Sequence, residues 1–245
     1  MDRLHKIISQ WGIASRRRAE NMIRSGRVRL NGRVASLGDQ ADPEVDRIEV
    51  DDQLIQPLER PQFIYLLLNK PLGVVSTCED EQGRTTVLDL LPQNLRSHQG
   101  IHPVGRLDAY STGALILTND GNLTFRLTHP RHEIPKIYHV WVTGIPSSQS
   151  LEQWRQGISL EEMQTLPAQI QILKKQLDQT LLQITMREGK NRQIRRIATY
   201  LGYPVISLHR VAIGNIQLTL PDQPTLLSGK YRPLSSQEIK FLQEM

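Results

Sequence analysis

The sequence predicts an α+β protein in two parts, a small α/β module over residues 1–55 and a larger domain over residues 63–245. The first observation is a pair of short helical patterns followed by a tight hairpin. The second is a polar stretch with two prolines, which predicts a linker over residues 56–62. The third is that strand and helix patterns beyond the linker do not alternate strictly. We therefore expect a mixed, largely antiparallel β-sheet flanked by helices.

Two helices are predicted at the start of the small module. Ser15 precedes the second helix, over residues 16–24, and is a favourable N-cap because its hydroxyl can accept a hydrogen bond from a free amide of the first turn. Gly26 ends that helix. Apolar residues at helical spacing form the two buried stripes, which are Leu4, Ile7 and Ile8, then Ala19, Met22 and Ile23.

A tight hairpin and one further strand complete the module. Asn31 and Gly32 separate strand patterns at residues 28–30 and 33–34, and these two residue types supply the positive φ angles of a type I′ turn. Residues 48–50 alternate in the manner of a third short strand.

The larger domain is rich in strands. Apolar runs and alternation predict strands at residues 63–68, 113–118, 137–143, 170–173 and 180–186. Helical spacing predicts helices at residues 123–128, 151–156, 193–201 and 236–242. Within one of these strands, Tyr138, Val140 and Val142 are expected to share a face.

Composition excludes several classes of protein. Among 245 residues there is one cysteine, Cys78, which rules out a disulfide framework or cysteine-based zinc site and favours a reducing cytoplasm. The apolar stretches fall well short of the ~20 residues that a membrane helix needs. The N-terminus lacks the apolar segment of a secretory signal. The histidines lack ligand spacing and no phosphate-binding loop is present, so we expect neither metal nor cofactor, and a monomer by default.

Positive charge is concentrated at the N-terminus. Residues 1–33 carry nine Lys and Arg against two acids, a net of +7, whereas the whole chain carries +5. Residues 34–62 reverse the sign, with eight acids against two arginines. Arg16, Arg17 and Arg18 occupy the first turn of a predicted helix, which is unfavourable for the helix dipole unless an anion is present. The sequence thus favours a polyanion-binding module, and a merely solvated basic face is the alternative.

Residues 2–50 resemble the S4 RNA-binding domain. The resemblance rests on Arg3-Leu4-x-Lys6-Ile7-Ile8, Gly12-x-Ala14-Ser15-Arg16, Ala19-Glu20, Gly26-Arg27-Val28 and Asn31-Gly32. It implies that the helices and hairpin dock on structured RNA by shape and backbone contacts. The residues that it makes candidates for RNA binding are Arg3, Lys6, Arg16, Arg17, Arg18 and Arg27.

A candidate catalytic motif, Gly-Arg-Leu-Asp, ends at Asp108 and is followed by Ser-Thr-Gly at residues 111–113. Alone, such an aspartate is more often a turn residue. Three other segments favour catalysis: residues 68–76 with the Asn-Lys-Pro-x-Gly pattern, the Lys-x-Tyr of residues 136–138, and residues 188–196 with Gly-Lys-Asn-Arg-Gln-Ile-Arg. In this order and spacing, the four segments resemble the RsuA/RluB family of ribosomal RNA pseudouridine synthases.

The resemblance implies a role for each matching residue. Asp108 matches the catalytic carboxylate, Tyr138 the tyrosine that stacks on the target base, and Arg195 the basic residue that pairs with the aspartate. Further RNA contacts are implied for Arg106, Lys190 and Arg192. The chain departs from the family at Ala109-Tyr110-Ser111, where relatives more often carry an acidic residue and a threonine, and at Ala114, where a leucine is usual.

The predicted helix from residue 192 to 201 gives a local reason for one of these roles. At 100° per residue, Arg195 lies at the edge of the apolar stripe, whereas Arg192 and Arg196 point to the opposite side. Arg195 can therefore meet Asp108 and favour its ionised form, as a nucleophile requires. The alternatives are a structural ion pair for Arg195 and an ordinary core aromatic for Tyr138.

The resemblance implies a pseudouridine synthase that isomerises a specific uridine in ribosomal RNA, with large-subunit RNA preferred over small-subunit RNA. Two other functions stay open. One is a non-catalytic RNA-binding or ribosome-assembly factor that retains the fold. The other is a hydrolase that uses Asp108, for which Asp120 and Glu188 are the candidates for a second carboxylate.

Overall fold

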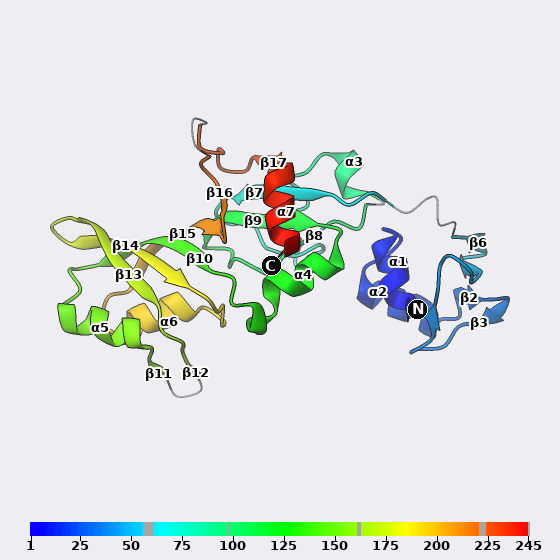
Figure 1. The fold of residues 1–245 in the computed structure, drawn as a ribbon, viewed down its shortest axis with the longest axis horizontal. Coiled ribbons are helices and arrows are strands. Elements are labelled where there is room, and N and C mark those ends of the chain that lie inside the picture. Colours follow the sequence, from blue (N-terminus) through cyan, green and yellow to red (C-terminus); the bar gives the residue numbers. More distant parts are fainter. Residues whose placement is uncertain (56–60, 98, 161–162, 221–223, 245) are drawn as a thin grey trace. The chain divides into compact units, whose positions relative to one another are not determined.

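The computed structural model describes residues 1–55, 61–97, 99–160, 163–220 and 224–244 (Figure 1). The chain forms two compact units. The first comprises Met1–Ile64, Leu91–His102 and Thr118–Gly121, and the second comprises Tyr65–Leu90, Pro103–Leu117 and Asn122–Met245. Most of the predicted linker lies outside the described residues, so the division into domains at residues 56–62 stays a prediction.

The N-terminal part of the first unit packs two helices with short strands. Its elements in chain order are β1 (Asp2–Arg3), α1 (Leu4–Gln10), α2 (Arg16–Arg24), β2 (Val28–Leu30), β3 (Arg33–Val34), β4 (Gln40–Ala41), β5 (Ile48–Val50) and β6 (Gln53–Leu54). β3, β2, β5 and β6 form a sheet in that order, and β1 pairs with β4. The Ser15 hydroxyl accepts a hydrogen bond from the Arg18 amide at 3.4 Å, which confirms the predicted N-cap.

The predicted hairpin is confirmed. Asn31 and Gly32 have φ angles of 51° and 81°, and Leu30 lies opposite Arg33 in an antiparallel pair. Both turn residues are therefore left-handed, as a type I′ turn requires. The apolar stripes of α1 and α2 also behave as predicted, because all six of their residues belong to one buried cluster with Val28 and Ile48.

Among the described residues, the main feature of the second unit is a nine-stranded sheet, in which seven strands lie in one row and two short strands pair at its side. The strand order is β13, β14, β10, β15, β9, β7, β17, with β16 on β15 and β8 on β9. β10 pairs antiparallel with β14 and β15, whereas β9 and β15 are parallel. The predicted mixed, largely antiparallel sheet is thus confirmed.

The remaining elements have these bounds. The strands are β7 (Tyr65–Lys70), β8 (His102–Pro103), β9 (Thr112–Thr118), β10 (Lys136–Thr143), β11 (Ser159–Leu160), β12 (Met163–Gln164), β13 (Gln169–Lys175), β14 (Gln179–Met186), β15 (Val205–Ile213), β16 (Ile216–Gln217) and β17 (Tyr231–Pro233). The helices are α3 (Gln93–Arg96), α4 (Gly121–Thr128), the 3-10 turn η2 (Pro130–His132), α5 (Ser148–Gln156), α6 (Gln193–Tyr200) and α7 (Ser236–Glu244). Within the described ranges, no helix combines the length and the apolar character needed to cross a bilayer.

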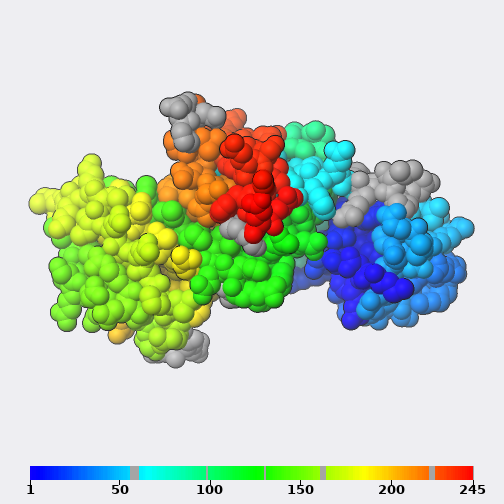
Figure 2. Space-filling view, in the orientation of Figure 1, coloured from blue at the N-terminus to red at the C-terminus, as the bar shows by residue number. Residues whose placement is uncertain are grey.

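Two apolar clusters hold the second unit together. In the first, Tyr138, Val140 and Val142 of β10 are buried with Leu182 of β14 and Ile197 of α6, as the predicted strand face requires. The second cluster gathers residues of β7, β9, α4 and α7. α5 packs on β13 at one end of the sheet, where residues coloured yellow-green gather in Figure 2. Arg155 of α5 donates two hydrogen bonds to the Ile170 carbonyl oxygen of β13, at 3.2 and 2.9 Å.

Several strands of this unit were not predicted. The longest of them is β15, a nine-residue strand that joins β10 to β9. Gly113, near the start of β9, approaches β15 so closely that an added Cβ would lie 2.2 Å from the Arg210 carbonyl oxygen. Its φ is +108°, in the region that favours glycine. A residue without a side chain is therefore required where these two strands meet.

Candidate active site

Asp108 lies in a short turn between β8 and β9, and hydrogen bonds fix the main chain on both sides of it. The Ser111 amide donates to the Asp108 carbonyl oxygen at 2.9 Å, which closes the turn. Ser76 holds the preceding residue, because its hydroxyl donates to the Leu107 carbonyl at 2.8 Å and accepts from the Leu107 amide at 3.1 Å. These contacts place the Asp108 carboxylate, and none of them involves the Asp108 side chain itself.

Lys70 supports the same turn from inside the protein. It is fully buried at the end of β7, and its ammonium group donates to the carbonyl oxygens of Pro71 at 3.0 Å, Ala109 at 3.5 Å and Ser111 at 2.8 Å. Burial lowers the pKa of Lys70 to about 8, although the charge of Asp108 opposes the shift. Lys70 has no ion-pair partner among the residues that the structure describes, and its ammonium group instead holds the turn that carries Asp108.

The carboxylate opens into a pocket of about 100 Å³. Asp108, Tyr138 and Arg195 all line it, together with Arg106, Lys190 and Arg192. The Tyr138 ring lies on β10 and is only 8% exposed, whereas the Asp108 side chain is 37% exposed. The structure therefore brings all three residues proposed as catalytic to one pocket, with an aromatic ring on its wall and a carboxylate that a ligand can reach.

The arginines of this pocket differ from the prediction. Arg192 Nη1 lies 3.6 Å from Asp108 Oδ2, and this is the ion pair that Asp108 makes among the described residues. Helix α6 begins only at Gln193, and Arg192 before it has a left-handed φ of 47°. The expected pairing of Arg195 with Asp108 is therefore not the one that the structure has. Arg192 takes that place, because it lies outside the helix and does not follow the helical phase that put it opposite the apolar stripe.

Arg195 holds the far side of the Asp108 turn. Its Nη2 donates to the Tyr110 carbonyl oxygen at 2.6 Å and to the Ser111 hydroxyl at 3.4 Å. Burial, followed by the charge of Arg192, lowers its pKa, while Asp108 raises it. Among the described atoms, Arg195 Nε is buried without a hydrogen-bond partner.

A local network positions the loop that carries Lys190 and Arg192. The Glu188 carboxylate accepts from the Gln193 side-chain amide at 2.6 Å and from the Leu166 backbone amide at 2.7 Å. The Gln193 side chain in turn accepts from the Lys190 amide at 3.1 Å. Glu188 thus has a supporting role that the sequence did not reveal, and it does not line the pocket as a second carboxylate.

Comparison with known proteins identifies the family. The RNA pseudouridylate synthase family matches residues 64–199, and the S4 domain matches residues 2–46. The chain is 40% identical over 248 residues to the ribosomal large subunit pseudouridine synthase B of Bacillus subtilis (strain 168), with 100% of this chain and 97% of that protein covered. The chain belongs to the RNA pseudouridylate synthase family.

Other relatives support the same family. An uncharacterized RNA pseudouridine synthase of Aquifex aeolicus (strain VF5) is 39% identical over 242 residues, covering 98% of this chain and 93% of that one. A solved pseudouridylate synthase crystal structure has a TM-score of 0.69 at 32% identity, covering 99% of this chain and 100% of that chain. The predicted family and fold class are confirmed, and the enzyme class is that of an isomerase.

The candidate RNA-binding residues of the S4 domain fall into two groups. Lys6 pairs with Asp2 at 2.7 Å, Arg27 pairs with Asp51 at 2.5 Å, and Arg3 donates to the Gly38 carbonyl at 2.8 Å. The three arginines of the first turn of α2, Arg16, Arg17 and Arg18, have exposed side chains. These last three are the better candidates for phosphate contacts, because the first three already have protein partners.

Cys78 does not provide a nucleophile near neutral pH. Burial, with a smaller effect from Glu79, raises the pKa of its thiol to about 11, so the thiol stays protonated. Among the described residues, no group of three or more His, Cys, Asp or Glu side chains is arranged to hold a metal ion.

Proposed function

We propose that this pseudouridine synthase isomerises a specific uridine of ribosomal RNA, in the large subunit in preference to the small one, with Asp108 as its catalytic carboxylate. The observation that carries the proposal is the pocket in which a reachable carboxylate, a buried tyrosine ring and three arginines meet. The choice of RNA is supported by two relatives named ribosomal large subunit pseudouridine synthase B, from Bacillus subtilis (strain 168) and Pseudomonas aeruginosa.

The proposed chemistry changes how one base is attached to its sugar. The target nucleotide leaves its stack, at a cost of a few kcal/mol. Stacking on Tyr138 offsets this by about 1–3 kcal/mol. Asp108 acts on the nucleoside as nucleophile or as base, the bond from N1 to C1′ breaks, and a bond from C5 to C1′ forms. The C5 proton is lost and N1 gains one, so the reaction is balanced without a co-reactant.

Arg192 and Arg195 complete this proposal. Arg192 lies beside the carboxylate, and Arg195 fixes the turn that carries it. Arg106 and Lys190 line the same pocket and are proposed to contact the RNA backbone. We further propose that the enzyme acts in the cytoplasm as a monomer, on the basis of the single cysteine and the default expectation for a chain of this size.

The experiment is a tritium-release assay with unmodified 23S and 16S ribosomal RNA labelled at C5 of uridine. Release from 23S RNA, with a carbon-linked isomer as product, is the expected result. Free uracil as product would identify a hydrolase instead. If neither RNA releases tritium and no free uracil forms, the function would be that of a non-catalytic RNA-binding factor. Pseudouridine maps of ribosomal RNA from cells with and without the protein then identify the uridine.

A second prediction concerns how the S4 domain holds RNA. Replacing Arg16, Arg17 and Arg18 by alanine is expected to weaken binding to unmodified ribosomal RNA and to flatten its salt dependence. The slope should fall by about one for each phosphate that the variant no longer binds. Filter binding between 50 and 200 mM salt measures both quantities. Arg27→Ala is the matched control, because that guanidinium is already paired with Asp51. An unchanged slope in the triple variant would contradict this docking mode.

A further inference from the structure

A second hollow, of about 330 Å³, adjoins the catalytic carboxylate. It shares Arg106, Leu107 and Asp108 with the pocket that contains Tyr138. Its other walls come from the loop after β7 and from Asn191, ahead of α6. Its volume lies at the lower end of the range for ligand-binding pockets, and it is larger than the Tyr138 pocket of about 100 Å³. The mechanism proposed above assigns this second pocket no role.

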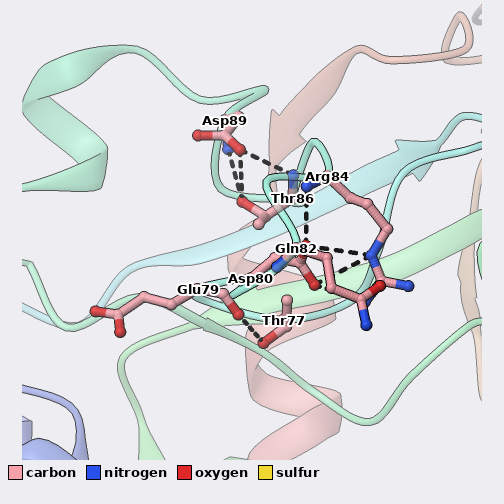
Figure 3. Close-up of polar contacts among 7 residues, drawn as sticks. All are labelled: Thr77, Glu79, Asp80, Gln82, Arg84, Thr86 and Asp89. Carbon is pink, nitrogen blue, oxygen red and sulfur yellow. Dashed lines mark hydrogen bonds and ion pairs between the residues drawn. The ribbon is translucent and has the colours of Figure 1, made fainter.

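The loop after β7 presents one arginine to the second pocket in a fixed orientation (Figure 3). Arg84 donates from Nη2 to Asp80 Oδ1 at 2.6 Å and from Nε to both carboxylate oxygens at 3.2 Å. Asp80 also accepts from the amides of Gln82 at 3.1 Å and Arg84 at 2.8 Å. The hydrogen bond from the Arg84 side chain, then that from its amide, lowers the pKa of Asp80 to about 2, so the pair stays ionised across the neutral range.

One edge of this guanidinium remains available. The Asp80 side chain is 7% exposed, whereas that of Arg84 is 52% exposed. Within the described part of the chain, Arg84 Nη1 makes no hydrogen bond, since Nε and Nη2 supply all three side-chain contacts to Asp80. An arginine that is held on one edge and open on the other matches the fork geometry that binds a phosphate group.

The rest of the loop is held as firmly as its arginine. Val75 forms a parallel bridge with Thr86, accepts from the Val87 amide at 3.0 Å and donates to the Thr85 carbonyl at 3.0 Å. Asp89 accepts from both the amide and the hydroxyl of Thr86, at 2.8 and 2.9 Å (Figure 3). The pocket wall is therefore formed before any ligand arrives, which lowers the entropy cost of binding.

We propose that the second pocket binds the nucleotide next to the target uridine and that Arg84 contacts its phosphate. This inference rests on the proposed function, because it requires a uridine in the Tyr138 pocket. Asp108 borders both pockets, and the target uridine stays covalently linked to its neighbours when it leaves its stack. A strand whose uridine reaches Asp108 must therefore pass the wall that the two pockets share. Arg106 lies on that wall and Arg84 lies beyond it.

The test is a double-mutant cycle between the protein and the RNA backbone. The full-length protein and its Arg84→Ala variant are titrated with synthetic RNA fragments that contain the mapped uridine. Two linkages are tested one at a time, the one before that uridine and the one after it. At the tested linkage the RNA carries either a phosphate or a neutral methylphosphonate. The nucleotide before that linkage is 2′-O-methylated in both versions. On the phosphate RNA, Arg84→Ala is expected to raise Kd about tenfold, the loss of one hydrogen-bonded charge. At one of the two linkages, the methylphosphonate should abolish most of the difference in Kd between the wild-type protein and Arg84→Ala.

The controls separate this inference from the proposed function. Lys175→Ala removes an exposed cation that lines neither pocket, and its effect should be the same on both RNAs. If Arg84→Ala is unstable, Arg84→Lys keeps the charge without the fork and should show a smaller coupling at the same linkage. If the effects of Arg84→Ala and of the methylphosphonate on Kd are strictly additive at both linkages, the proposed role of the second pocket is wrong, whereas the proposed function is unaffected. Failure of the wild-type protein to release tritium from ribosomal RNA would overturn the proposed function itself.

Discussion

Asp108→Asn is expected to abolish tritium release, with a loss of at least about 10³-fold in the single-turnover rate. The amide has nearly the shape of the carboxylate but is neither a nucleophile nor a base, and groups in such roles contribute about 10²–10⁴-fold. The rate is measured with excess enzyme over C5-tritiated ribosomal RNA, so that slow product release does not hide the chemical step.

Two measurements show whether such a loss reflects chemistry. The thermal midpoint should change little, because the main chain around Asp108 is held by Ser76 and Lys70, and the partly exposed pair with Arg192 at 3.6 Å contributes about 0–1 kcal/mol. The Kd for ribosomal RNA should also stay within a few-fold. Equal tritium release by the variant and the wild type would remove Asp108 from the catalytic role.

The parts of the fold that could be predicted are those set by local patterns. Asn31 and Gly32 specify their turn through their own backbone preferences, and the structure has the two positive φ angles. The burial of Tyr138 follows from alternation along β10. The four motifs predicted that Asp108, Tyr138 and Arg195 serve one site, and the structure places all three on one pocket, although their roles stay predictions.

The parts that could not be predicted depend on partners distant in sequence. β15 lacks a clear apolar alternation because Arg210 occupies a buried position in it. The Arg210 Nε donates a hydrogen bond to the Ala114 carbonyl oxygen at 2.6 Å, a partner that the sequence alone does not reveal. The position of Arg192 depends on where α6 begins, which the network of Glu188 with Leu166 helps to fix. Lys70, which ends a strand that begins with four apolar residues, was the available signal of a buried support for the site.

Gly113→Ala is expected to lower the free energy of unfolding by about 3 kcal/mol or more. The left-handed φ of +108° alone costs an alanine about 1–2 kcal/mol. The new Cβ would also lie 2.2 Å from the Arg210 carbonyl oxygen and 2.7 Å from its amide nitrogen, and neither backbone atom can rotate away. The variant must therefore separate β9 from β15, and urea denaturation measures the resulting loss.

Gly202→Ala is the matched control because its φ is +87° and no atom of the described residues lies within 4 Å of the added Cβ. It should lose only the backbone cost of about 1–2 kcal/mol. Equal losses in the two variants would mean that β9 and β15 can part freely, contrary to their close approach in the structure. Because Gly113 lies two residues beyond Ser111, which closes the Asp108 turn, Gly113→Ala should also lower the tritium-release rate at temperatures where it is still folded. Gly202→Ala should leave that rate unchanged, since Gly202 lines neither pocket.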